Sequence, residues 1–195
     1  MSECLTLAKL YKELSGDDNV LRTKILIKLN EDFHFGDRVV EALKSSQIIE
    51  ELMRGMKDKD EKIRELSSHA VLLVGKCELG KVTLVEKGYV LNISDLMDDS
   101  VVAIRRNSYN CLLEVVEYRQ GIDSVIEFGI IQILVDKLIL EKDHSILILT
   151  LTLLNALLEG EKGPRVALKT KMIGRLNGLL DSPNHKVWIP LPTSD

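Results

Sequence analysis

The chain has 195 residues, of which 45% are hydrophobic and 29% are charged, and its formal net charge is −4. This composition is typical of one globular domain with a sizeable core, and it lacks the basic surplus that nucleic-acid-binding proteins carry. Three cysteines without CxxC spacing, Cys4, Cys77 and Cys111, indicate neither a disulfide framework nor a zinc site. We therefore expect a protein of a reducing compartment with no nucleic-acid partner.

The sequence predicts neither secretion nor membrane insertion. Charged residues interrupt the N-terminal apolar stretch, so no signal peptide is expected there. The longest apolar tract, Ile146 to Leu158, is shorter than the about 20 residues that a helix needs to cross a bilayer. The expected location is cytoplasmic.

An apolar triplet with helical spacing i, i+3, i+7 recurs along the whole chain at steps of 41 or 42 residues. Its five occurrences are Leu7, Leu10, Leu14; Ile49, Leu52, Met56; Val90, Ile93, Met97; Ile131, Leu134, Leu138; and Ile173, Leu176, Leu180. Five occurrences that keep step at all three positions indicate an internal repeat.

A second helical pattern begins between successive triplets. It opens with an apolar residue, followed by arginine in three of the repeats: Leu21-Arg22, Ile63-Arg64, Ile104-Arg105, Ile146 and Val187. A short polar residue that can cap a helix stands three positions earlier, at Asp18, Asp60, Asp143 and Asn184. In the third repeat the turn reads Asp98-Asp99-Ser100, so we expect the cap to be shifted by a residue there.

Glycines mark a third, shorter element in each repeat. Gly80, Gly121 and Gly163 introduce a brief apolar patch, whereas Gly36 lies out of phase and indicates a small insertion around residues 32–37. Gly88 and Gly129 end the short helix, where a positive φ favours glycine.

These patterns predict an all-α, right-handed solenoid of three-helix repeats, because a unit of about 41 residues buries its apolar faces only by stacking. The β-branched tract Ile146 to Leu154 resembles a strand, but its phase assigns it to a long helix. We expect one repeat domain over residues 1–182 and an irregular, proline-containing tail over 183–195. Its repeats are approximately 1–46, 47–88, 89–129 and 130–171, with a partial fifth from 172.

The repeats resemble armadillo repeats through Glu86-Lys-Gly88-Tyr-Val and Glu127-Phe-Gly129-Ile-Ile. Ser46 and Lys171 replace the glycine at the other junctions. More narrowly, three segments resemble the radial spoke head 14 family of motile cilia: 58–64, 96–107 and 138–146. This resemblance implies a non-enzymatic subunit of the ciliary axoneme whose partners are radial spoke proteins. Pro190 and Pro192 stop the last repeat, which implies a shortened version of such a protein.

No pattern for catalysis, for a cofactor or for a metal is present. The four histidines, His34, His69, His144 and His185, fall in different repeats, and no phosphate-binding loop occurs. Asp58-Lys-Asp60 and Asp98-Asp99 lack the glycine and the glutamate of a calcium loop. We expect Cys111 to be a small core residue, since it shares its phase with Ala70.

The long helices are expected to line the concave face, and their non-core positions are the candidate contacts for a protein partner. This surface passes from polar to apolar toward the C-terminus, where we expect part of Ile146 to Leu158 to lack cover. A partner, or a second copy of the chain bound through the truncated repeat, is expected to cover it. The candidates are Arg64, His69, Arg105, Arg106, Tyr109, Asn110, Leu147, Leu151 and Asn155.

A nuclear-import or other cargo adaptor of the armadillo class is the alternative function. Adaptors that bind basic peptides display Trp and Asn four residues apart on successive long helices. Asn30 and Asn155 have that phase, but Leu26 and Leu151 precede them, and the one tryptophan, Trp188, lies beyond the repeats. These residues therefore support the cargo-adaptor function less than the axonemal one.

Overall fold

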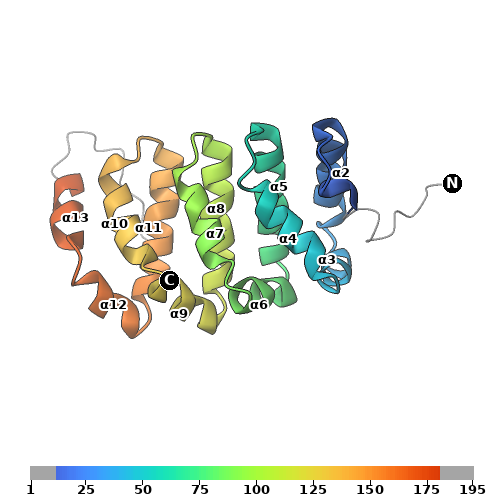
Figure 1. Ribbon diagram of the computed structural model, residues 1–195. Coiled ribbons are helices and arrows are strands. Elements are labelled where there is room, and N and C mark those ends of the chain that lie inside the picture. The colour runs from blue at the N-terminus through green and yellow to red at the C-terminus, as the bar shows by residue number, and fades with distance from the viewer. Residues whose placement is uncertain (1–11, 181–195) are drawn as a thin grey trace, which may run out of the picture.

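The computed structural model describes residues 12–180, and every regular element in this part of the chain is a helix (Figure 1). Four long helices lie side by side, each packed against the next. They are α2 (Asn19–Asp32), α5 (Glu61–Gly75), α8 (Val102–Val116) and α11 (His144–Leu158). The apolar tract from Ile146 is therefore helical, as its phase predicts.

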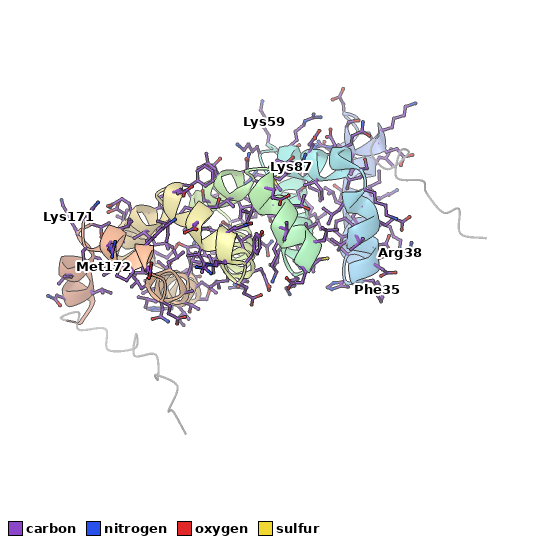
Figure 2. The ribbon with its side chains drawn as sticks, turned by 90° about the horizontal axis from the view of Figure 1, so that it is seen from below. Phe35, Arg38, Lys59, Lys87, Lys171 and Met172 are labelled. Atoms are coloured by element: carbon purple, nitrogen blue, oxygen red, sulfur yellow. The ribbon has the colours of Figure 1, made fainter. Side chains whose placement is uncertain are left out.

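Each long helix is followed by a short helix and then by a helix of intermediate length. The short helices are α3 (Gly36–Leu43), α6 (Glu78–Glu86), α9 (Arg119–Glu127) and α12 (Lys162–Ala167). The intermediate ones are α4 (Ser46–Gly55), α7 (Val90–Asp95) with the 3-10 turn η1 (Leu96–Asp98), α10 (Ile130–Leu140) and α13 (Met172–Leu180). Figure 2 shows Phe35 and Arg38 near one end of this array and Lys171 and Met172 near the other. None of the helices between residues 12 and 180 is long and apolar enough to span a membrane.

Aspartates cap three of the four long helices, as predicted. The carboxylates of Asp18, Asp60 and Asp143 each accept hydrogen bonds from two amides of the first helical turn. Helix α8 lacks such a cap, because Val101 occupies the equivalent position, so the expectation of a cap shifted by one residue is wrong. The carboxylate of Asp99 instead accepts a hydrogen bond from the Val101 amide at 2.9 Å. The turn before α8 is thus stabilised by the Asp99 side chain, two residues before Val101.

The recurring glycines serve two different purposes. A Cβ on Gly80, Gly121 or Gly163 would lie 1.9, 2.0 or 1.8 Å from the carbonyl oxygen near the end of the preceding long helix, so only glycine fits. Gly88 and Gly129 have φ of 72° and 73°, the left-handed conformation expected of them. Gly36 begins α3, and an added Cβ would meet nothing within 4 Å.

The recurring triplets form the core in the three central repeats, where all nine side chains are at most 2% exposed. In the first triplet Leu14 is buried, and Leu7 and Leu10 lie outside the described residues. The fifth triplet departs from the pattern, since Ile173 is 58% exposed. Helix α13 is the last described helix, and no described long helix follows to cover this side chain. Asn184 and Val187, expected to begin that helix, lie outside the described residues.

Candidate functional site

A ladder of ion pairs joins consecutive repeats along the starts of the long helices. Each arginine of the recurring apolar-Arg dipeptide contacts a carboxylate one repeat further on. The pairs are Arg22–Asp58 at 2.7 Å, Arg64–Asp99 at 2.8 Å and Arg105–Glu141 at 3.1 Å. All six side chains are less than 20% exposed. The three arginines thus connect consecutive repeats within the chain.

The ladder also fixes the turn that leads into each long helix. The carboxylates of Asp58, Asp99 and Glu141 each accept a hydrogen bond from the amide two residues later at 2.9 Å. The Arg64 guanidinium also donates to the carbonyl oxygen of Asp58 at 3.0 Å. Burial by itself would raise the pKa of the Asp99 carboxyl, but the hydrogen bonds from Arg64 and the Val101 amide hold it below its ordinary value. Arg64 and Arg105, two predicted partner contacts, therefore already have partners within the chain.

A second line of polar contacts connects neighbouring long helices. The Asn30 amide donates to the Leu66 carbonyl oxygen at 3.0 Å, and its Oδ1 lies 2.7 Å from Nδ1 of His69. The Asn107 amide donates to Ser68 Oγ at 3.0 Å. Burial is the largest cause that lowers the pKa of His69, and the nearby charges of His34 and Lys76 lower it further. The imidazole is consequently neutral near pH 7.

Two other predicted contacts are core residues. Tyr109 is fully buried, and its hydroxyl lies 3.0 Å from Thr150 Oγ1. Leu147 is 6% exposed, so the expectation that this leucine lacks cover is wrong. Leu26 and Ser68, which share the phase of Tyr109, are buried too, because this position points toward the adjacent long helix. The solvent-facing position is the residue that follows in the sequence.

Eight exposed or half-buried residues of the long helices stand at two equivalent positions and form two rows of four, which we call the long-helix face. The first row is Thr23, Glu65, Arg106 and Ile148; the second is Ile27, His69, Asn110 and Thr152. Ile27 and Ile148 are 44% and 48% exposed. The structure thus brings three of the predicted contacts, His69, Arg106 and Asn110, to one surface.

Leu151 and Asn155 lie beside this face. Leu151 is half-buried, whereas Asn155 is exposed and donates its side-chain amide to Glu159 at 3.2 Å. The uncovered apolar surface of α11 centres on Ile148 rather than on Leu147. At the same end of the molecule, Leu140 and Leu168 are 71% and 67% exposed.

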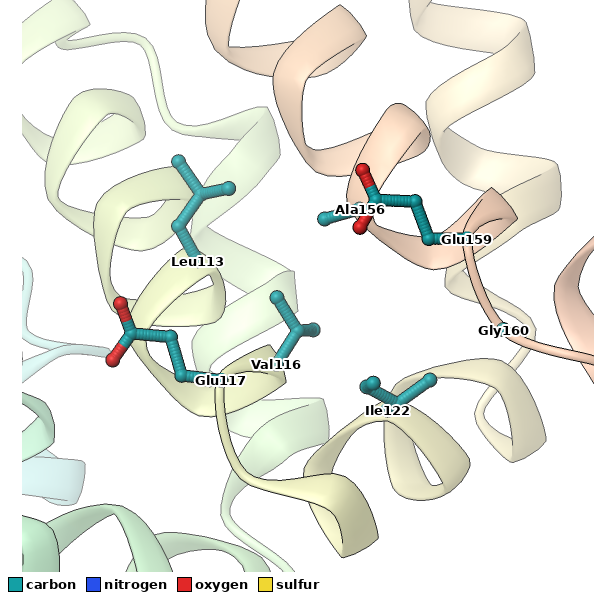
Figure 3. Close-up of a pocket in the computed structure, with 7 residues that line it drawn as sticks. All are labelled: Leu113, Val116, Glu117, Ile122, Ala156, Glu159 and Gly160. Atoms are coloured by element: carbon teal, nitrogen blue, oxygen red, sulfur yellow. The ribbon is translucent and has the colours of Figure 1, made fainter.

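A pocket of about 470 Å³ opens between the C-terminal ends of α8 and α11, above α9 (Figure 3). Its lining combines apolar side chains with two glutamates and consists of Leu113, Val116, Glu117, Ile122, Ala156, Glu159 and Gly160. None of these seven lining residues is among the contacts predicted from the sequence. The sequence feature that could have indicated the pocket is Ile122, which stands where the preceding repeat has Lys81.

Within residues 12–180, no three His, Cys, Asp or Glu side chains are grouped so that they could hold a metal ion. Cys111 is buried as predicted, and burial raises the pKa of its thiol to about 12. That thiol is therefore protonated at neutral pH and has no nucleophilic character.

No family model matches the sequence. Solved structures with a similar fold include a computationally designed armadillo repeat protein for modular peptide recognition, with a TM-score of 0.80 and 17% identity. Another is a designed armadillo repeat protein in complex with the peptide (KR)4, with a TM-score of 0.80 and 16% identity. Both alignments cover 93% of this chain and 77% of the other. The predicted armadillo-type fold is confirmed.

Proposed function

We propose that this armadillo-type solenoid is a non-enzymatic scaffold that binds a segment of another protein along its long-helix face. One observation carries the proposal: the positions that hold the stack repeat from unit to unit, whereas the exposed positions do not. Arginine recurs at 22, 64 and 105, but the row beside it reads Thr23, Glu65, Arg106, Ile148. A surface that differs at each repeat can distinguish successive residues of a bound segment.

The chemistry of this face fits protein recognition. It places an isoleucine at each end, at 27 and 148, around a polar centre that contains His69, Arg106 and Asn110. Exposed apolar residues beside a few charged and amide groups are typical of protein interfaces. The complex of a designed neighbour with the peptide (KR)4 supports the use of this fold for peptide binding.

For the biological setting, we propose the radial spoke of motile cilia, with other spoke subunits as partners. The support is the sequence resemblance in segments 58–64, 96–107 and 138–146. These segments include the turns that the arginine ladder holds, so they relate the chain to its proposed relatives through the way its repeats stack.

Charge reversal at Arg106 tests the binding surface. Arg106 is exposed, and its guanidinium donates only to Ser145 Oγ at 3.0 Å among the contacts found in residues 12–180, so Arg106→Glu is expected to fold normally. A tagged copy in ciliated cells, followed by crosslinking mass spectrometry, should recover spoke subunits with the parent chain and lose them with Arg106→Glu. The matched control is Lys87→Glu, a charge reversal at another exposed residue, in the turn between α6 and α7. Equal loss with both variants would contradict a role for the long-helix face.

The cargo-adaptor alternative is favoured by the exposed carboxylate of Glu159 at the pocket, which suits a basic segment. The long helices oppose it, because the position of the tryptophan ladder is occupied by Leu26, Ser68, Tyr109 and Leu151. Recovery of nuclear-import proteins in the same experiment, without spoke subunits, would establish the alternative. A second copy as the partner would appear as a doubled mass in light scattering.

A further inference from the structure

The pocket between α8 and α11 corresponds, one repeat earlier, to a place that a lysine of the chain itself fills. Lys81, on α6, is 3% exposed, and its ammonium lies 2.7 Å from a carboxylate oxygen of Glu117 and 3.1 Å from one of Glu78. Its four methylenes are buried beside α8, and the ion pair sits where that helix ends. The fold thus contains a built example of lysine recognition.

The next repeat lacks the lysine and keeps one of its two acceptors, because Arg119 stands in the position of Glu78. Glu159 stands in the position of Glu117, directly after the end of α11. Ile122 stands in the position of Lys81, and its side chain is too short to reach Glu159. The pocket of about 470 Å³ opens at this point (Figure 3). The missing lysine side chain is therefore matched by an open volume and an exposed carboxylate, one oxygen of which accepts a hydrogen bond from the Asn155 amide at 3.2 Å.

The electrostatics of the pocket favour a cation. Helices α8 and α11 both end at its rim, so the negative ends of two helix dipoles lie beside it together with the carboxylate of Glu159, whereas the carboxylate of Glu117 is already paired with Lys81. The nearby ammonium of Lys162 is paired with Asp123 at 2.8 Å. Leu113, Val116 and Ile122 supply the apolar surface that an alkyl chain needs.

We propose that this pocket binds a lysine side chain of a partner protein, with the methylenes over Ile122 and the ammonium at Glu159. The proposal deepens the scaffold function and rests on it, because it assigns one residue of the bound segment a chemical identity and a place. Both the apolar wall and the acidic rim are needed. Lysine is therefore expected to bind better than an uncharged chain of similar length.

The test uses the full chain with its isoleucine methyl groups labelled for NMR, and a short capped peptide that contains one lysine between glycines and serines. We expect a saturable shift of the Ile122 δ1 methyl signal, assigned through Ile122→Val. A peptide with norleucine in place of lysine should bind about fivefold more weakly, since it loses only a partly exposed ion pair. Equal affinity for the two peptides, or no saturable shift, would overturn the proposal.

Variants of the protein separate the pocket from the wider surface. Glu159→Gln should weaken lysine-peptide binding about fivefold, whereas its matched control Glu161→Gln, exposed but outside the pocket, should change nothing. Ile122→Lys should abolish binding by placing the chain's own lysine against Glu159. If that variant does not fold, Glu159→Gln still decides the matter. Loss of partners with Arg106→Glu but unchanged peptide binding with Glu159→Gln would reject the lysine pocket and leave the scaffold function intact.

Discussion

The junction between α5 and α8 and the junction between α8 and α11 share one frame, the arginine ladder and the close-packed glycines. They differ in the side chains that occupy the space at the ends of the long helices. Both have the arginine ladder, through Arg64–Asp99 and Arg105–Glu141. At the first junction α5 ends in Gly75, where an added Cβ would lie 3.2 Å from Cys111 Sγ, and Lys81 occupies the remaining space. At the second, Val116 and Ile122 stand in these positions, and a pocket is present.

The comparison separates residues that define the repeat from residues that distinguish one repeat from another. The ladder and the close-packed glycines recur because every junction needs the same spacing between helices. Side chains at the ends of the long helices are free to vary, so they are where the repeats acquire different surfaces. Substitutions in the shared frame are therefore expected to have larger effects than substitutions that touch a single junction.

The largest effect is expected at the close-packed glycines. Gly121→Ala would place a Cβ 2.0 Å from the Val115 carbonyl oxygen, which the backbone relieves only by moving α9 away from α8. We expect a loss of about 3 kcal/mol in the free energy of unfolding, measured by urea denaturation. Gly36→Ala is the control, because nothing lies within 4 Å of its added Cβ. Similar stability of the two variants would contradict the close approach.

Removal of one arginine of the ladder comes next. Arg64→Ala leaves the carboxylate of Asp99, which is 8% exposed, without its guanidinium. We expect about 2 kcal/mol of destabilisation in the same measurement, less than for a backbone clash. Arg38→Ala, which breaks an exposed pair with Glu41, is the control and should be nearly neutral. A double-mutant cycle with Asp99→Asn should show coupling; additive losses would mean that the pair contributes nothing jointly.

The ladder also predicts a dependence of stability on pH. The pKa of Asp58 and of Asp99 is lower in the folded protein than the ordinary 3.8, so the unfolded chain binds more protons in acid. Their contribution is complete above the ordinary value and is lost as pH falls through the folded pKa. Urea midpoints from pH 6 to pH 2 should therefore fall below about pH 4. In the Asp99→Asn variant the urea midpoint should fall less steeply with pH than in the parent chain. A pH profile identical to that of the parent would contradict the assignment of this fall to Asp99.

The smallest effect is expected from a contact of the second junction alone. Tyr109→Phe removes the hydroxyl that lies 3.0 Å from Thr150 Oγ1, while the ring and its packing stay in place. A loss of about 1 kcal/mol is expected in urea denaturation, since the Thr150 hydroxyl also bonds to the Ile146 carbonyl oxygen. Tyr118→Phe, at a partly exposed tyrosine after α8, serves as the control. A stabilised Tyr109→Phe variant would show that the buried hydroxyl is a net cost.

The fold was predictable because its information is periodic. The spacing of the triplets placed α4, α7 and α10 in the core, and the spacing of the aspartates placed the caps of α2, α5 and α11. What periodicity does not fix is the rotation of each long helix against its neighbour. For that reason Tyr109 was expected at the surface and is buried, whereas the adjacent Asn110 lies on the long-helix face.

The candidate site was less predictable because it depends on partners within the chain. Arginines 64 and 105 are indistinguishable in the sequence from surface charges, and only the distance to Asp99 and Glu141 reveals that they are occupied. The pocket likewise follows from the length of one side chain, Ile122, relative to the volume around it.

Site-specific photocrosslinking tests the central claim, that a protein partner lies on the long-helix face, most directly. A photoreactive amino acid at position 110, in the centre of the face, is compared in ciliated cells with the same group at position 87, in the turn between α6 and α7. We predict a discrete crosslinked protein from position 110 and none from position 87. Crosslinks from position 87 alone, or equally from both, would contradict the account.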